Sequence, residues 1–160
     1  LDLSSFSRAT ARFDMRQLRE QNHRVLQTLP YAAVADRLPV GVTARFWEVV
    51  RENLATIGEA ERWWRVVAGE IAPPVLAGDA AFLRQAAELL PPEPWDGATF
   101  PAFAAALKIA SGRRGRALFH PLRLALTGAE AGPELARLLP LMGRARALRR
   151  LRQAGGGSSA

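Results

Sequence analysis

The 160-residue sequence contains no cysteine, which excludes disulfides and thiolate metal sites. It has two histidines, His23 and His120, too far apart in sequence to form a recognisable ligand motif. No apolar run approaches the roughly 20 residues that a membrane span requires, and no glycine-rich phosphate loop of the Walker or dinucleotide type occurs. We therefore predict no catalytic residue, no metal site, no cofactor-binding residue and no membrane partner for this chain. The cysteine-free composition is compatible with a cytoplasmic location.

Lysine is also nearly absent, since 21 of the 22 basic residues are arginine. Residues 1–107 carry 11 arginines and 13 acids, a net charge of −2, whereas residues 108–152 carry 11 basic residues and two acids, a net charge of +9. Such a basic region is typical of nucleic-acid binding. A compositional bias of the source genome explains the arginine-to-lysine ratio equally well, so the clustering is the stronger observation.

The sequence predicts helices throughout and no strand, because apolar residues recur at helical spacing and nowhere alternate over five residues. We expect Asp14 to cap the first helix and Pro30 to follow its end. Pro121 is expected in the first turn of its helix. The expected helices span residues 14–29, 31–38, 43–57, 59–68, 79–90, 99–112, 121–127, 133–142 and 144–152.

Proline-rich segments at 73–74 and 91–94 are the best candidate boundaries. We predict one helical subdomain over residues 1–72, a second over 73–152, and a flexible glycine- and serine-rich tail over 153–160. The sequence does not start with methionine, so we expect it to begin inside a longer protein.

Three groups of side chains leave alternatives open. The four tryptophans could stack on bases, but Trp47 and one of the pair Trp63 and Trp64 are expected in the core. His23 is expected on the solvated surface, and His120 in a loop or at a partner contact. The arginines of the last predicted helix suit either RNA phosphates or a solvated face.

Residues 115–143, GRALFHPLRLALTGAEAGPELARLLPLMG, closely resemble the C-terminal signature of bacterial glutamyl-tRNA synthetases. Residues 4–31 also look like the segment that follows the catalytic part in that family. The resemblance implies an all-α "helical cage" of two anticodon-binding subdomains at the end of a class I synthetase. It also implies an enzyme that joins glutamate to tRNA(Glu) using ATP and Mg²⁺, and we expect this protein to be monomeric. Its His-Ile-Gly-His-type and Lys-Met-Ser-Lys-Ser-type motifs are absent here, so this chain alone should not aminoacylate.

The resemblance also implies which residues bind tRNA. Arg123 matches a family arginine that reads the anticodon, and a first-turn position after Pro121 would place it near the positive end of the helix dipole. Pro133 and Leu135 match positions beside the last anticodon bases, although a core role suits Leu135 equally well. Arg113, Arg114 and Arg116 are expected to screen phosphates.

A weaker match over residues 44–56 places Arg45 at an anticodon-reading position. Asn53 falls where many members have an arginine that distinguishes C from U at the wobble base. This departure implies relaxed discrimination, so that tRNA(Gln) would be accepted as well as tRNA(Glu).

Two rival interpretations follow from the same residues. The first is an all-α interaction module or pseudo-synthetase fragment that no longer binds tRNA, which would show no salt-dependent RNA affinity. The second is a metabolic enzyme with an all-α pocket, and the lack of any catalytic grouping disfavours it.

Overall fold

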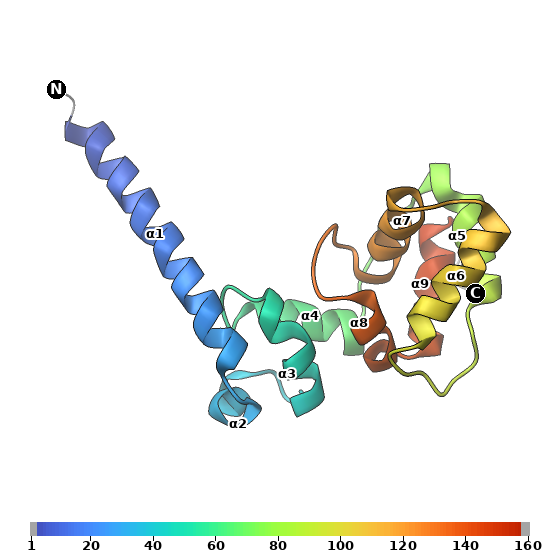
Figure 1. The fold of residues 1–160 in the computed structure, drawn as a ribbon, viewed down its shortest axis with the longest axis horizontal. Coiled ribbons are helices and arrows are strands. Elements are labelled where there is room, and N and C mark those ends of the chain that lie inside the picture. The colour runs from blue at the N-terminus through green and yellow to red at the C-terminus, as the bar shows by residue number, and fades with distance from the viewer. Residues whose placement is uncertain (1–2, 158–160) are drawn as a thin grey trace. The chain divides into compact units, whose positions relative to one another are not determined.

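The structure, a computed structural model, describes residues 3–157, with side chains for Arg12 and for residues 14–157 (Figure 1). The described residues are helical with no strand, which confirms the predicted all-α class. The elements are α1 (Leu3–Thr28), α2 (Tyr31–Val34), η1 (Ala35–Arg37), α3 (Ala44–Val50), η2 (Arg51–Asn53), α4 (Glu59–Ala68), η3 (Ala77–Asp79), α5 (Ala80–Leu89), α6 (Thr99–Ser111), α7 (Arg116–Thr127), α8 (Leu135–Met142) and α9 (Arg144–Ala154).

The chain forms two compact units, residues 1–63 and residues 64–160. This division falls within α4, whereas the predicted boundary between residues 72 and 73 follows its end. No change in composition marks a boundary that falls inside a helix. A prediction based on prolines therefore places the boundary at the next helix-breaking residues, Pro73 and Pro74.

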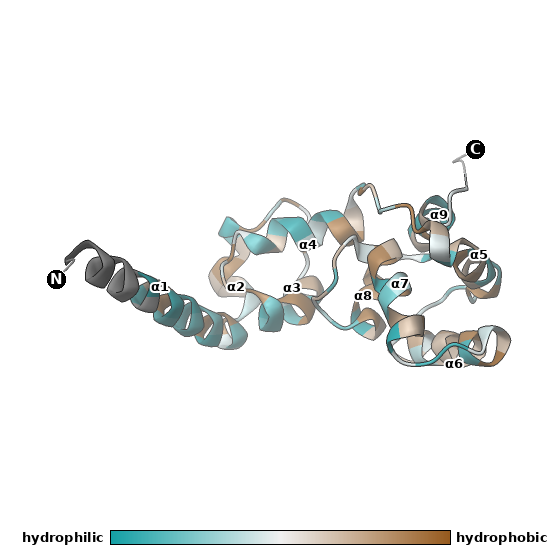
Figure 2. Cartoon of the chain, turned by 90° about the horizontal axis from the view of Figure 1, so that it is seen from above, coloured by the Kyte–Doolittle hydropathy of each residue, from teal (hydrophilic) through white to brown (hydrophobic). Residues whose placement is uncertain are grey.

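Helix α1 begins at Leu3, and the prediction that Asp14 caps it is wrong. No glycine or proline interrupts residues 3–28, and the alanines and arginines before Asp14 favour helix. The helix ends at Thr28, one residue before the predicted end, because the residue before Pro30 disfavours helical backbone angles. Its apolar residues Met15, Leu18 and Val25 are exposed, whereas Leu26 is buried. Figure 2 shows that α1 is hydrophilic over most of its described length.

The first unit is held together by side chains that bind the carbonyl groups at helix ends. Leu29 O accepts hydrogen bonds from Trp47 Nε1 at 2.8 Å and from Arg51 Nη1 at 3.0 Å. Trp47 is fully buried and Trp63 is 5% exposed, which confirms the predicted core roles. These contacts satisfy a carbonyl that the end of α1 leaves without an intrahelical partner.

His23 is half-buried, so its prediction as a solvated surface residue is wrong. Its Nδ1 donates to Leu54 O at 2.8 Å, and its Nε2 accepts from Gln27 Nε2 at 2.8 Å.

The contacts of residues 54 and 55 explain why α3 ends at Val50 rather than continuing to residue 57. Leu54 O bonds to His23, and Ala55 N donates to the Glu59 carboxylate at 2.9 Å, so side chains replace the helical partners of both groups.

In the second unit, α9 packs against α5, α7 and α8, while α6 packs against α5, α7 and α8. The buried side chains come from all five helices and include Leu83, Leu107, Leu122, Leu138 and Leu151. In Figure 2 these helices carry broader hydrophobic faces than α1 does. Burial of these faces is the main source of stability for short helices, which are marginal in isolation.

Pro121 lies inside α7, so the prediction that it begins the helix is wrong. The helix starts at Arg116, after Gly115 at φ +54°. A proline in the helix interior leaves the carbonyl four residues earlier without its N–H partner. Here that carbonyl, Ala117 O, accepts a hydrogen bond from Arg113 Nη1 at 3.1 Å.

The end of the chain is folded further than predicted. α9 continues to Ala154, whose carbonyl accepts from Leu76 N at 2.8 Å. Gly155 is buried, and a Cβ there would lie 3.3 Å from Leu151 O and 3.5 Å from Leu83 Cβ. Residues 153–154, assigned from sequence to the tail, thus belong to α9, while residues 158–160 lie outside the described part.

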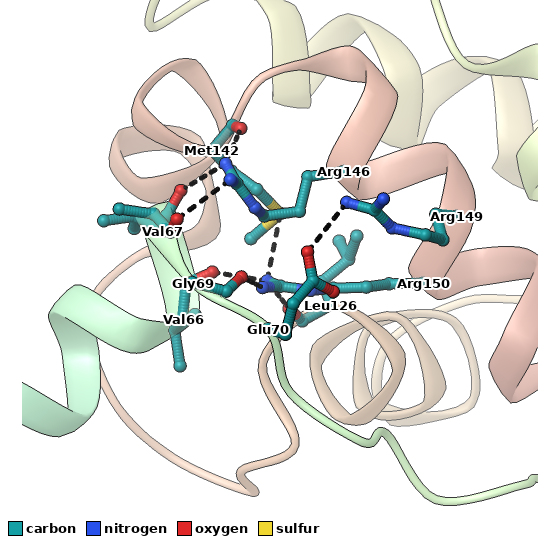
Figure 3. A network of polar contacts seen from close by, with 10 residues as sticks. Val66, Val67, Gly69, Glu70, Leu126, Met142, Arg146, Arg149 and Arg150 are labelled. Atoms are coloured by element: carbon teal, nitrogen blue, oxygen red, sulfur yellow. Dashed lines mark hydrogen bonds and ion pairs between the residues drawn. The ribbon is translucent and has the colours of Figure 1, made fainter.

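Two arginines of α9, Arg146 and Arg150, bind backbone carbonyls (Figure 3). Arg150 is 1% exposed and donates to Val66 O, to Leu126 O at 2.9 Å and to Gly69 O at 3.1 Å. Arg146 donates to Val67 O at 2.7 Å and to Ala68 O at 3.0 Å. Burial, followed by repulsion from Arg146, lowers the pKa of Arg150 to about 10, which still leaves it protonated at neutral pH.

This arrangement predicts opposite outcomes for two neighbouring substitutions. Arg150→Met should lower the free energy of unfolding by about 3 kcal/mol, because it leaves buried carbonyls without donors. Arg149→Met is the matched control, since Arg149 makes a surface ion pair with Glu70 at 3.2 Å and should change stability by less than about 1 kcal/mol. Urea unfolding followed by circular dichroism measures both, and equal effects would contradict the assignment.

Candidate nucleic-acid interface

Three cations of the second unit lie in and beside the connection between α6 and α7. Lys108, Arg114 and Arg116 are exposed, and none makes an ion pair or hydrogen bond with any residue that the structure describes. The turn that carries them depends on Gly112 at φ +70° and Gly115 at φ +54°, angles that L side chains rarely adopt. The connection and the helix ends beside it therefore present three positive charges to solvent that no described residue neutralises.

Arg113 has a different environment from its neighbour Arg114. Its Nη1 lies 2.6 Å from Asp79 Oδ1, and its guanidinium lies 4.4 Å from the centre of the Phe82 ring. Asp79 opens the predicted helix 79–90 and is a residue type that commonly caps helices, but it makes no side-chain capping bond and binds Arg113 instead. Arg113 thus joins the start of α5 to the start of α7, and its charge is balanced within the unit.

Arg123 is half-buried in the middle of α7, not in its first turn as predicted. The helix dipole acts within the terminal turns, so it does not explain the position of this side chain. Its Nη1 donates to Pro133 O at 3.1 Å, and no carboxylate among the described residues pairs with it. Burial lowers the pKa of Arg123 below its ordinary value. The guanidinium is therefore oriented by a carbonyl but not neutralised.

The loop after α7 is shaped by the Thr127-Gly128 pair. Thr127 Oγ1 donates to Arg123 O at 2.8 Å and accepts from Ala129 N at 3.1 Å, while Gly128 ends the helix at φ +70°. After this turn the chain runs back along α7, and the Pro133 carbonyl accepts a hydrogen bond from Arg123. The Thr127 hydroxyl and the left-handed Gly128 thus place the carbonyl that orients the Arg123 guanidinium.

Pro133 and Leu135 are buried, and Leu135 is 5% exposed. α8 begins at Leu135, two residues after the predicted start. Leu135 packs in the core, which was one of its two expected roles. Pro133 faces Arg123 through its carbonyl group.

Arg45 and Asn53 belong to the first unit, on α3 and η2. Both side chains are exposed, without an ion pair or hydrogen bond to any described residue. Thr43 Oγ1 caps α3 by accepting from Phe46 N at 3.2 Å, which fixes where Arg45 lies on the helix. The other six predicted site residues belong to the second unit.

Two further residues of α7 lie near these cations. Phe119, which was not among the predicted site residues, is 45% exposed. His120, expected in a loop or at a partner contact, is half-buried within the helix with Nε2 3.6 Å from Glu130 Oε1. Arg116, Phe119 and Arg123 are spaced three and four residues apart and share a helix face. A helix placed from Arg116 rather than Pro121 would have revealed this spacing.

Within the described part of the chain, no three histidine, aspartate or glutamate side chains gather as metal ligands. No helix there is long and apolar enough to cross a membrane.

A helical unit that presents unneutralised cations on one connection and an oriented arginine beside it is typical of the class of nucleic-acid-binding modules. Residues 76–155 match the family model described as "Anticodon binding domain", a segment that lies wholly within the second unit. The chain belongs to the anticodon-binding domain family.

Similar proteins agree with this assignment. The chain is 60% identical over 151 residues to glutamate–tRNA ligase 2 of Granulibacter bethesdensis and 57% identical over 155 residues to glutamate–tRNA ligase 2 of Acidiphilium cryptum. These matches cover 94% and 97% of this chain but 34% and 35% of the relatives, so the chain spans about a third of their length. Its fold is similar to part of a glutamate tRNA ligase from Elizabethkingia meningosepticum, with a TM-score of 0.66, 16% identity, and coverage of 86% of this chain and 31% of that one.

The different environments of Arg113 and Arg114 give a testable separation of roles. Arg113→Met should lower the free energy of unfolding by about 1–2 kcal/mol, because it removes a charge-assisted hydrogen bond and a cation–π contact. Arg114→Met should leave stability within about 0.5 kcal/mol. Urea denaturation of both variants provides the measurement, and a larger loss for Arg114→Met would show that the two side chains have been assigned the wrong way round.

Proposed function

We propose that this chain is the anticodon-binding part of a glutamate–tRNA ligase and that it binds tRNA(Glu). One observation carries the proposal for the site: the half-buried guanidinium of Arg123 is aligned by Pro133 O and has no carboxylate partner among the described residues. A guanidinium held in this way can offer its remaining N–H groups to a base edge or phosphate without first breaking an ion pair. Membership of the anticodon-binding domain family supports the same partner.

The roles of the other residues follow from their exposure and charge. Arg123 reads an unstacked anticodon base, which is the usual way that proteins read RNA sequence. Arg114 and Arg116 contact phosphates, because their charges are free. Arg113 supports the fold through Asp79. Arg45 and Asn53 contact other anticodon bases from the first unit.

In the whole ligase, glutamate activation with ATP and Mg²⁺ belongs to the part that this chain lacks. The role of this chain is to hold the anticodon arm in register, and it does not aminoacylate by itself. We propose that the ligase is a monomer acting in the cytoplasm, where tRNA is charged.

Arg123 supplies the decisive test. Arg123→Ala should weaken binding of tRNA(Glu) by about 1–3 kcal/mol, and the loss should disappear with a tRNA whose anticodon has been exchanged. Arg123→Lys should recover only part of the affinity, because lysine keeps the charge but lacks the planar fork. Filter binding at fixed salt measures these affinities.

Arg149→Ala is the control, because Arg149 lies outside the proposed surface and is paired with Glu70. Equal binding of the native and exchanged anticodons by the unmodified chain would exclude base reading. An affinity independent of salt concentration would favour an interaction module that has lost tRNA binding.

Asn53 tests the specificity of the first unit. We expect the short amide of Asn53 to permit binding of tRNA(Gln) as well as tRNA(Glu). Asn53→Arg should then raise the affinity for tRNA(Glu) relative to tRNA(Gln) by about tenfold or more, since a bidentate arginine–base contact discriminates by about 1–3 kcal/mol. Competition between the two tRNAs for the 160-residue chain provides the ratio. An unchanged ratio would show that Asn53 does not face the base that distinguishes these tRNAs.

A further inference from the structure

A pocket of ≈ 390 Å³ lies between α6 and the start of α7, within the range of small-ligand sites. One face of α6 lines it through Phe100, Ala104 and Lys108, which follow each other at intervals of one helical turn. The opposite side is formed by Arg114, Leu118 and Phe119. No predicted site residue other than Arg114 belongs to it.

The pocket has an aromatic wall. Phe119 is 45% exposed although most large apolar side chains of this unit are buried, and its ring centre lies 6.3 Å from that of Phe100. Phe100 is 7% exposed and braces Phe119 from behind. An exposed ring on a rigid support is a surface on which another flat ring can stack.

Positive charge borders the same pocket. Lys108, in the last turn of α6, and Arg114, in the connection to α7, both line it, and both are free of ion pairs with described residues. None of the lining residues is acidic. The site therefore combines an apolar aromatic wall with two cations, which complements a flat ring attached to an anion.

We propose that this pocket binds an unstacked nucleobase of the RNA loop by stacking on Phe119, with the adjoining phosphate held by Lys108 and Arg114. The inference rests on the proposed function and adds to it a base contact separate from the one made by Arg123. Aromatic stacking with a cationic border is the usual chemistry of single-strand recognition. An amphipathic peptide helix would need a long groove for several anchors, which a single pocket of this volume does not provide.

The position on α7 explains how the two base contacts work together. Arg123 follows Phe119 by four residues, so both side chains lie on one face of the helix, one turn apart. A base on Phe119 would thus neighbour the base read by Arg123. Since every base has a flat face, Phe119 would add affinity with little sequence preference, whereas Arg123 would supply the selectivity.

The test compares variants of the 160-residue chain with tRNA(Glu) transcript as the probe. Phe119→Leu should weaken binding about tenfold, because leucine fills the space but offers no ring. The slope of log K against log salt should stay the same, since no charge is lost. Phe119→Tyr should keep the original affinity, and Arg114→Ala should weaken binding and reduce the slope by about one. Ile109→Ala is the matched control, an 87% exposed apolar residue of α6 outside the pocket.

Two comparisons separate this inference from the proposed function. If Phe119→Leu binds tRNA(Glu) as the unmodified chain does while Arg123→Ala weakens binding, the stacking pocket is refuted and anticodon binding stands. A second probe, a single-stranded RNA hexamer, covers the opposite case. Binding of the hexamer that depends on Phe119, without binding of tRNA(Glu), supports the pocket and refutes the proposed function.

Discussion

The second unit depends on the contacts that the buried cation of Arg150 makes with backbone carbonyls. Its guanidinium joins residues 66 and 69 at the end of α4 to residue 126 near the end of α7, all from a single position on α9. Helix ends leave carbonyls without partners, and burying them unsatisfied is costly. One planar group with several donors satisfies three of them at once, so α9 serves as the central support for the helices around it.

Arginine therefore has two roles in this chain: some arginines bind groups of the protein itself, and others are exposed to solvent. Arginines that are adjacent in sequence can have different roles. Arg150 is buried and Arg113 is paired with Asp79 within the unit, whereas the adjacent Arg149 and Arg114 are exposed. On α9 the directions of successive residues differ by about 100°, so Arg150 points inward while Arg149 points to the surface. The cations left for a polyanionic partner in this region are fewer than composition suggests, and they concentrate where α6 meets α7.

Glycines and prolines, which interrupt helices, made most helix ends of this fold predictable. Gly112 and Gly128 end α6 and α7, and Gly143 precedes α9, which agrees with the ends predicted for the helices 99–112 and 121–127 and with the start predicted for 144–152. Pro121 did not mark the start of its helix because Arg113, a side chain of the preceding turn, binds the carbonyl that the proline leaves free. Asp79 failed similarly, since it pairs with Arg113 rather than capping α5. Local rules miss such competition between partners.

The sequence by itself determined the all-α class, most helix ends, the basic C-terminal third and the resemblance to an anticodon-binding region, because these follow from periodicity, breakers and motif order. Only the tertiary structure decided which arginines remain free, that Arg123 rests on Pro133 O, and that Phe119 stands at an open pocket. The physical reason is that charge and exposure belong to the packed chain. A side chain is available to a partner only if no internal carbonyl, carboxylate or ring has already bound it.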